Sequence, residues 1–140
     1  MIKKLLATQN EPVRVDVALL LIRLVMGTAF ILHGWGKIQA PMNWMGPDAP
    51  VPGIFQALAA ISEFGGGIAL ILGLVTRLAS LGIAFTMLVA VCTHRFAMGD
   101  PFVNPTGGGS YELASVYLTV AILFIVTGAG RYSLDRKIFG

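Results

Sequence analysis

Val15–Leu32 reads VDVALLLIRLVMGTAFIL, an apolar stretch close to the width of a bilayer. At about 1.5 Å of rise per residue, such a stretch forms a helix nearly as long as the roughly 30 Å hydrocarbon core of a membrane. Three similar stretches follow at Ile54–Val75, Leu78–Cys92 and Leu113–Thr127. Backbone groups must be paired internally where no water reaches them, so each stretch is expected to be helical. The sequence therefore predicts an all-α membrane protein with four spans.

Composition and spacing favour a single domain. Of 140 residues, 56% are hydrophobic and 12% are charged, which is about half of the roughly 25% charged residues in a soluble domain. Only a few residues around Thr76 and Arg77 join the second and third stretches, so these two helices should form an antiparallel hairpin. We predict one antiparallel four-helix transmembrane bundle over residues 1–140, with spans near 15–33, 53–75, 77–94 and 111–128.

Small residues recur along the second predicted span. Gly65, Ala69 and Gly73 are four residues apart, which places them on one face of a helix. Small side chains allow helices to approach closely in lipid, so this face is expected to pack against a neighbouring helix.

The basic residues indicate how the chain is oriented. With four spans, both chain ends and the loop between the second and third spans lie on the same side of the membrane. The basic residues on that side are Lys3, Lys4, Arg14, Arg77, Arg131, Arg136 and Lys137. Only Lys37 and Arg95 lie in the other two loops. The positive-inside rule then predicts cytoplasmic termini. Because the basic residues lie at segment ends and not along a stripe, the expected partner is the lipid bilayer, and nucleic acid is not expected.

Two ionisable residues lie deep within the predicted spans. A charge at the bilayer centre costs roughly 2.5–3.5 kcal/mol on insertion scales, so each of them needs a partner or a function. Counting about 1.5 Å per residue, Arg23 and Glu63 are offset by roughly 6 Å, which an extended arginine side chain reaches. We predict an interhelical Arg23–Glu63 ion pair. The alternatives are that Arg23 extends to the cytoplasmic headgroups and that Glu63 stays protonated.

A second group of polar residues gathers near the outward ends of the predicted helices. It comprises His33, Lys37, His94, Arg95 and Glu112. Histidine donates or accepts a hydrogen bond and takes up a proton, whereas lysine and arginine stabilise a developing negative charge. Combined with apolar walls, these are the properties that a site for a quinone headgroup requires. Contacts to lipid headgroups are the alternative, most of all for Lys37 and Arg95.

Metal and thiol chemistry are not expected. Cys92 is the only cysteine, which excludes C-x-x-C chemistry, c-type haem attachment and cysteine-ligated iron–sulfur clusters within this chain. Di-metal helix bundles use Glu-x-x-His motifs, and the sequence contains none. We expect no metal or covalent cofactor, and a quinone is the candidate ligand.

Several short motifs follow one another in a fixed order. They are Leu21–Leu24 with Gly27, Phe30, His33, Gly34 and Lys37, Glu63 with Gly66 and Gly67, Leu72–Leu74 with Thr76 and Arg77, Gly108 and Gly109 with Glu112, and Gly128 with Gly130–Asp135. This order resembles the DoxX family of small four-span bacterial membrane proteins. The resemblance implies a four-helix transmembrane bundle in the bacterial cytoplasmic (inner) membrane. In some members it is a subunit of a quinone-linked sulfur oxidoreductase, and in others it is associated with thiol or oxidative-stress proteins. The positions that match the family's polar motif are Arg23, His33, Lys37, Glu63 and Glu112.

Two functional hypotheses follow. The first is a membrane subunit that interacts with quinone near the outer face and supports a partner oxidoreductase, with any activity dependent on that partner. His33 and Glu112 would hydrogen-bond the quinone oxygens, Lys37 and Arg95 would stabilise reduced oxygen, and no residue is assigned a catalytic role. The second is a non-catalytic membrane scaffold or a small-solute carrier, although a carrier normally has polar residues on both sides of the membrane. A redox subunit and a second copy of the chain are candidate partners.

Overall fold

The protein is built from helices. A computed structural model describes residues 11–140, and its elements are α2 (Val13–Gln39), α3 (Gly53–Leu72), α4 (Thr76–Cys92), the π-helix η1 (Thr93–Ala97), α5 (Glu112–Thr127) and α6 (Leu134–Phe139). No strand occurs among these residues, and the predicted all-α class is confirmed. Lys3 and Lys4, which contributed to the predicted orientation, lie outside the described part of the chain.

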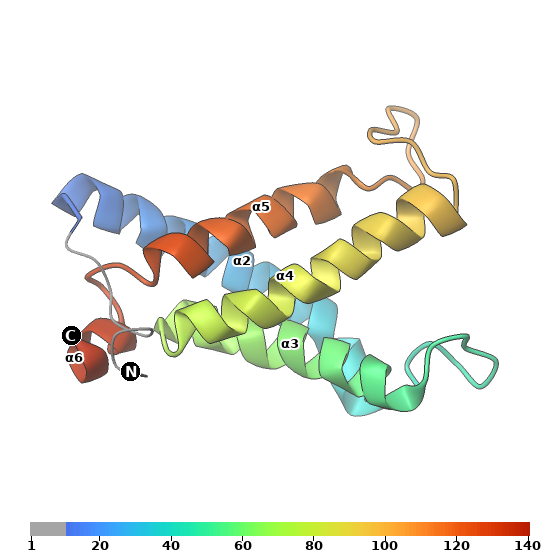
Figure 1. Cartoon of the computed structure of the whole chain (residues 1–140), viewed down its shortest axis with the longest axis horizontal. Coiled ribbons are helices and arrows are strands. Elements are labelled where there is room, and N and C mark those ends of the chain that lie inside the picture. Colours follow the sequence, from blue (N-terminus) through green and yellow to red (C-terminus); the bar gives the residue numbers. More distant parts are fainter. Residues whose placement is uncertain (1–10) are drawn as a thin grey trace.

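The long helices run back and forth along the longest axis of the molecule (Figure 1). α2 packs along α3, α4 packs along α5, and α3 and α4 connect the two pairs. We call the end that carries α6 and the start of α2 the terminal end. The opposite end, where residues 40–52 and 98–111 connect the helices, is the loop end.

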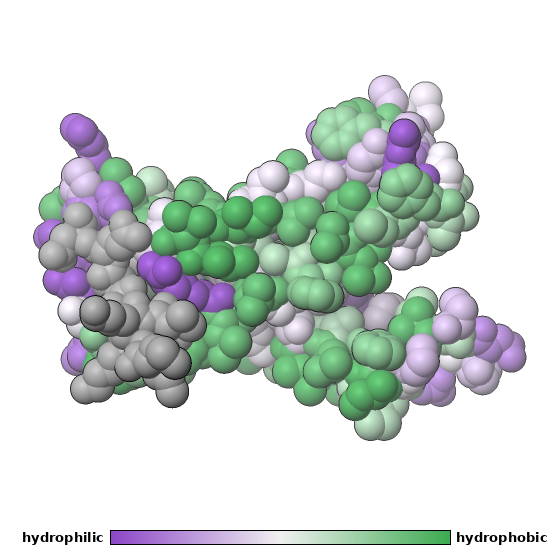
Figure 2. All heavy atoms as spheres, viewed as in Figure 1, coloured by the Kyte–Doolittle hydropathy of each residue, from purple (hydrophilic) through white to green (hydrophobic). Residues whose placement is uncertain are grey.

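Three helical segments are long and apolar enough to cross a membrane. They are α2, α3 and the continuous stretch Thr76–Ala97 formed by α4 and η1. α5 is also apolar but has only 16 residues, which corresponds to about 24 Å of helix. Apolar side chains cover much of the middle of the visible face, and polar side chains gather towards its two ends (Figure 2).

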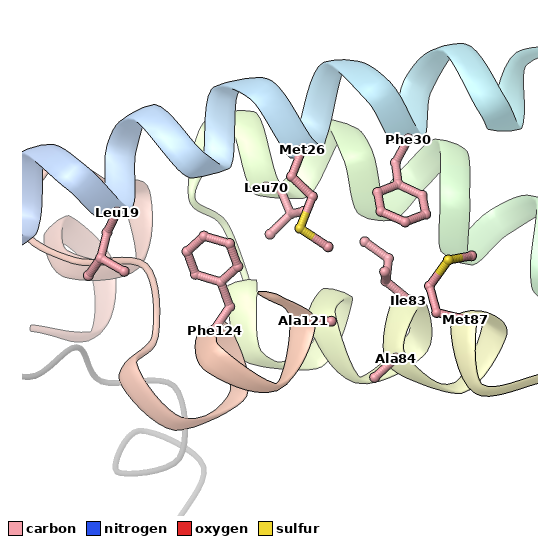
Figure 3. Packing of buried hydrophobic residues seen from close by; sticks show 9 residues of the cluster. All are labelled: Leu19, Met26, Phe30, Leu70, Ile83, Ala84, Met87, Ala121 and Phe124. Atoms are coloured by element: carbon pink, nitrogen blue, oxygen red, sulfur yellow. The ribbon is translucent and has the colours of Figure 1, made fainter. Parts of the chain in front are cut away.

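Apolar side chains from all four long helices meet in the middle of the molecule (Figure 3). Phe30 of α2, Leu70 of α3, Ile83 of α4 and Phe124 of α5 are each at most 1% exposed. Lipid removes most of the hydrophobic drive for helices to associate, so this contact stabilises the fold mainly through close packing.

Glycines bring the backbones of α2 and α3 into direct contact. A Cβ atom added at Gly67 would lie 2.7 Å from the carbonyl oxygen of Gly27, and one added at Gly27 would lie 2.7 Å from that of Gly67. A Cβ at Gly65 would have only Ile61 near it, at 4.0 Å. The close contact therefore uses Gly67 and not the predicted face through Gly65, because helix periodicity alone does not fix which of several adjacent glycines faces a neighbour.

Arg23 joins three segments at the terminal end. Its side chain is 1% exposed, and its Nε and Nη2 atoms donate to the carbonyl oxygens of Leu70 at 2.8 Å and Ile71 at 3.2 Å. Nη1 donates to the carbonyl oxygens of Ala129 at 2.5 Å and Tyr132 at 3.0 Å. The last carbonyls of a helix have no partner within that helix. Arg23 supplies one at the end of α3 and ties the segment after α5 to the same place.

Two buried carboxylates complete the terminal end. The two carboxylate oxygens of Asp135 accept hydrogen bonds from the backbone N–H groups of Val75 at 2.6 Å and Thr76 at 2.8 Å, and thereby cap the start of α4. Asp16 accepts a hydrogen bond from the backbone N–H of Arg131 at 2.8 Å. The segment after α5 is therefore hydrogen-bonded to the start of α2 and the start of α4, as well as to the end of α3.

Replacing Arg23 by Met should destabilise the protein by at least about 3 kcal/mol, because each hydrogen bond from a charged group contributes about 1.5–3 kcal/mol and several buried carbonyls lose their donor. Thermal unfolding in detergent measures the effect. The control is Arg14→Met, which removes an exposed arginine from the same helix. Equal unfolding temperatures for the two variants would contradict this role of Arg23.

Replacing Gly67 by Ala should destabilise the α2–α3 contact by about 1–3 kcal/mol, since the added methyl group has no room beside the backbone of α2. Gly65→Ala is the matched control because its methyl group would have only the Ile61 side chain near it, at 4.0 Å, an ordinary van der Waals distance. We expect Gly65→Ala to be neutral or slightly stabilising in the same unfolding measurement. A loss of stability in Gly65→Ala alone would show that the wrong face had been assigned.

Candidate functional site

A cavity of about 270 Å³ lies at the loop end, between the α2–α3 pair and the α4–α5 pair. The space-filling view is hollowed between the same two pairs at this end (Figure 2). The polar lining of the cavity comes from α2, α3, η1, the loop before α5 and α5 itself. It consists of His33, Lys37, Glu63, His94, Ser110 and Tyr117. Apolar side chains such as Phe30, Met87 and Leu113 form the rest of the wall.

A lysine and a glutamate form an ion pair on the α2–α3 side of the cavity. Lys37 Nζ lies 2.7 Å from each carboxylate oxygen of Glu63. The Glu63 side chain is 3% exposed and that of Lys37 is 26% exposed. Lys37 Nζ also lies 4.5 Å from the ring centre of Trp44, within the range of a cation–π contact. The two charges balance, so the pair adds no net charge to the cavity.

The predicted Arg23–Glu63 ion pair does not form, and each residue has other partners. α2 extends to Gln39, beyond the predicted end of the first span, so Lys37 lies on the helix and reaches Glu63. Arg23 lies 14 residues before Lys37, which is about 21 Å along the helix. This displacement places Arg23 beside Leu70, where backbone carbonyls take the place of a carboxylate.

Aromatic rings connect α2 to α5 at the cavity wall. The ring centres of Phe30 and Tyr117 are 5.0 Å apart, and those of His33 and Tyr117 are 6.2 Å apart at an interplanar angle of 75°. These separations suit tilted and edge-to-face ring contacts. Phe30 is 1% exposed, whereas His33 is exposed at the loop end. The His33 ring is therefore held beside two aromatic rings and remains accessible.

His94 is placed on the opposite wall by η1. The π-helix begins directly after α4, and its wider turn ends with the backbone N–H of Met98 donating to the carbonyl oxygen of Thr93 at 3.0 Å. His94 Nδ1 lies 2.6 Å from Oδ2 of Asp100 in the following loop. Single turns of π-helix occur frequently at functional sites, where they redirect a side chain.

Arg95 and Glu112 do not line the cavity, although the sequence grouped them with the histidines. The guanidinium of Arg95 lies 5.7 Å from the ring centre of Tyr111, and Arg95 is exposed. Glu112 is exposed in the first turn of α5, where the helix dipole favours a negative charge. Of the five predicted ligand-site residues, the structure brings His33, Lys37 and His94 together, and it adds Glu63 to them.

Sequence analysis missed three residues at this site. Tyr117 lies one helical turn after Leu113, and helical periodicity from that residue identifies it as a wall residue. Trp44 lies in the loop after α2, and its ring covers the Lys37 ammonium. Asp100 lies in a loop without periodicity, so no sequence signal connects it to His94.

The donors and acceptors of the cavity are suited to hydrogen bonding and proton transfer. Across residues 11–140, no three His, Cys, Asp or Glu side chains lie close enough together to hold a metal ion. Two imidazole rings, a phenol and a balanced ion pair instead surround an apolar space. Such a set of groups can donate and accept hydrogen bonds at the edge of an apolar ligand.

Comparison with known proteins places this chain in a family. The family model for DoxX matches residues 18–95, which is more than half of the chain. Inner membrane protein YqjF of Escherichia coli (strain K12) is 38% identical over 133 residues, covering 86% of this chain and 92% of that protein. Inner membrane protein YphA of the same strain is 32% identical over 132 residues, covering 86% and 90%.

A protein of Bacillus subtilis (strain 168) named "Putative oxidoreductase CatD" is 27% identical over 127 residues, and the alignment covers 89% of each chain. No solved structure matches this chain. The resemblance inferred from the order of the motifs is confirmed by the family match and by relatives named as inner membrane proteins. The chain belongs to the DoxX family of bacterial inner-membrane proteins.

Proposed function

We propose that this protein binds the ring of a quinone in the loop-end cavity and supports a partner oxidoreductase in the membrane. The observation that carries the proposal is the convergence of His33, His94 and Tyr117 on one apolar cavity. Its volume of about 270 Å³ is close to the lower end of the range for small-molecule pockets, roughly 300–1,000 Å³. A single ring system suits this volume, with an apolar tail extending into the lipid.

The charge balance of the cavity favours a neutral ligand. Lys37 is already neutralised by Glu63 at 2.7 Å, so it does not offer a free positive charge to an anion. In this arrangement His33 and His94 hydrogen-bond the quinone oxygens from opposite walls, and Phe30 and Tyr117 contact the ring. Glu112 and Arg95, outside the cavity, act at its rim or at the lipid headgroups.

The same proposal assigns an orientation in the membrane. The loop end faces outward and the termini are cytoplasmic, as the positive-inside rule indicates. α5 is the fourth span. Its length of about 24 Å is less than the thickness of the hydrocarbon core, and local thinning of the bilayer or the residues flanking α5 make up the difference. The cavity then opens at the level of the headgroups, where a quinone ring has access from the lipid.

A solute carrier receives less support from the same geometry. Between the cavity and the terminal end, the space between the helices is filled by apolar side chains such as Met26, Leu70 and Phe124. Arg23 then closes the terminal end through its hydrogen bonds to backbone carbonyls. Within residues 11–140, the polar cavity therefore opens at the loop end and is separated from the terminal end by apolar side chains.

A link to redox chemistry comes from the family. One relative, 27% identical, carries the name of an oxidoreductase, and the family resemblance includes quinone-linked subunits. We extend this to a partner subunit that exchanges electrons with the bound quinone.

Protein purified in mild detergent should bind a short-chain ubiquinone analogue saturably, and native mass spectrometry should detect the complex. His33→Ala should weaken binding by up to about tenfold, which corresponds to the loss of one hydrogen bond. Gln39→Ala is the control, since this residue lies on the same helix and does not line the cavity. The proposal fails if the unaltered protein retains no quinone and shows no saturable binding.

Removing Lys37 and removing Glu63 should reduce the stability of the protein by different amounts. Lys37→Met should destabilise the protein by about 3 kcal/mol, the lower end of the range for a broken buried pair, because Glu63 stays buried without a partner. Glu63→Leu should cost less, since Lys37 is partly exposed and reaches water. The double variant Lys37→Met/Glu63→Leu should recover most of the lost stability. Additive losses in thermal unfolding would contradict a direct interaction.

A further inference from the structure

We propose that His94 and Asp100 form a pair that accepts the proton of a phenolic hydroxyl bound in the loop-end cavity. The inference rests on the proposed function, because the reduced form of a quinone carries phenolic hydroxyl groups. It assigns the cavity a ligand class, the hydroxyl-bearing ring, and it assigns Asp100 a role as a positioning residue.

The two nitrogens of the His94 ring have different surroundings. Nδ1 is engaged by Asp100 Oδ2 at 2.6 Å. The His94 ring lines the cavity and Asp100 does not, so Nε2 is the nitrogen available to a ligand. A carboxylate bound at Nδ1 fixes the ring orientation and stabilises the imidazolium that forms when Nε2 takes up a proton.

The loop between η1 and α5 is built around this contact. The backbone N–H of Asp100 donates to the carbonyl oxygen of His94 at 2.9 Å, which returns the chain to the histidine directly after the π-helix. On the other side of the carboxylate, a Cβ added at Gly109 would lie 2.5 Å from Oδ2 of Asp100 and 2.6 Å from Oδ1. Asn104 holds Gly109 in place by donating to its carbonyl oxygen at 3.3 Å. The carboxylate therefore occupies a space that only a residue without a side chain leaves free.

The other groups around the cavity are less suited to accept a proton. The carboxylate of Glu63 is engaged by Lys37 through both oxygens. The His33 ring contacts Phe30 and Tyr117, and no carboxylate within residues 11–140 forms a hydrogen bond or an ion pair with it. The guanidinium of Arg95, next to His94 in the sequence, lies over Tyr111. His94 alone combines a place in the cavity wall with a carboxylate on its second nitrogen.

The proposed step is a proton transfer without a change in oxidation state. The O–H bond of the ligand breaks and an N–H bond forms at Nε2. A phenolate then lies beside an imidazolium, whose charge is balanced by Asp100. Removing the proton from a reduced quinone makes its later oxidation by a partner easier, but the test below needs no electron transfer.

The probe is 4-nitrophenol, whose phenolate has a distinct visible absorption band. Protein in lipid nanodiscs should bind it in the cavity, and the phenolate fraction of the bound probe should exceed that seen with empty nanodiscs at the same pH. Asp100→Asn should lower the ratio of bound phenolate to bound phenol by about tenfold or more, because a hydrogen bond to a charged group is lost. Binding of the probe itself, measured by equilibrium dialysis, should change much less. Asp48→Asn, in the exposed first loop, is the matched control.

A second variant tests the same contact without changing either member of the pair. Gly109→Ala adds a methyl group where the Asp100 carboxylate lies, so the carboxylate has to move away from His94. It should reproduce the loss seen with Asp100→Asn. Gly36→Ala is its control, because a Cβ atom there meets nothing within 4 Å. Thermal unfolding of each variant shows whether the bundle remains folded.

The outcomes distinguish this inference from the proposed function. Equal phenolate fractions in the unaltered protein and in both loop variants would overturn the role of the pair. The same conclusion follows if the quinone analogue binds and 4-nitrophenol does not. If neither compound binds, the proposed function fails together with the inference.

Discussion

The structure depends on the exclusion of water from the bilayer, which requires partners within the protein for the backbone polar groups and the buried charges of the spans. Arg23 meets this requirement through backbone carbonyls at the end of α3 and in the segment after α5. In doing so it fixes the positions of segments that are more than a hundred residues apart in the sequence. Asp16 and Asp135, both 1% exposed, add hydrogen bonds to backbone N–H groups at the same end. The charged side chains at this end thus hold the helices and the segment after α5 together.

The loop end shows the opposite use of polar groups. Lys37 and Glu63 form an ion pair with each other, while the His33 ring and Nε2 of His94 remain available to a ligand. At the terminal end, carbonyls of α3 and of the segment after α5 converge on Arg23, whereas at the loop end a cavity lies between the two helix pairs. Ionisable side chains therefore close the terminal end through hydrogen bonds to the backbone, and at the loop end they line a cavity.

Hydropathy alone was sufficient to predict the helical class, because apolar stretches of this length have one common solution in lipid. It also placed His33, Lys37 and His94 at the same end. Pairing across helices was not predictable, since α2 continues to Gln39 and this continuation shifts the partner of Glu63 from Arg23 to Lys37. The contact between Asp100 and His94 depends on a π-helix and on an irregular loop, and neither has a periodic signal in the sequence. Features that depend on the position of one residue along its own helix could be predicted from the sequence. Contacts between residues of two different segments could not.

The backbone contact between Gly27 and Gly67 has a mechanical consequence. Two helices locked glycine to glycine behave as one stiff body, since any sliding or tilting would drive main-chain atoms into each other. The α4–α5 pair has no such lock at the loop end, where side chains and the cavity separate it from α2 and α3. We therefore expect any change in the width of the loop-end cavity to come from the α4–α5 pair, because α2 and α3 cannot shift against each other at these glycines.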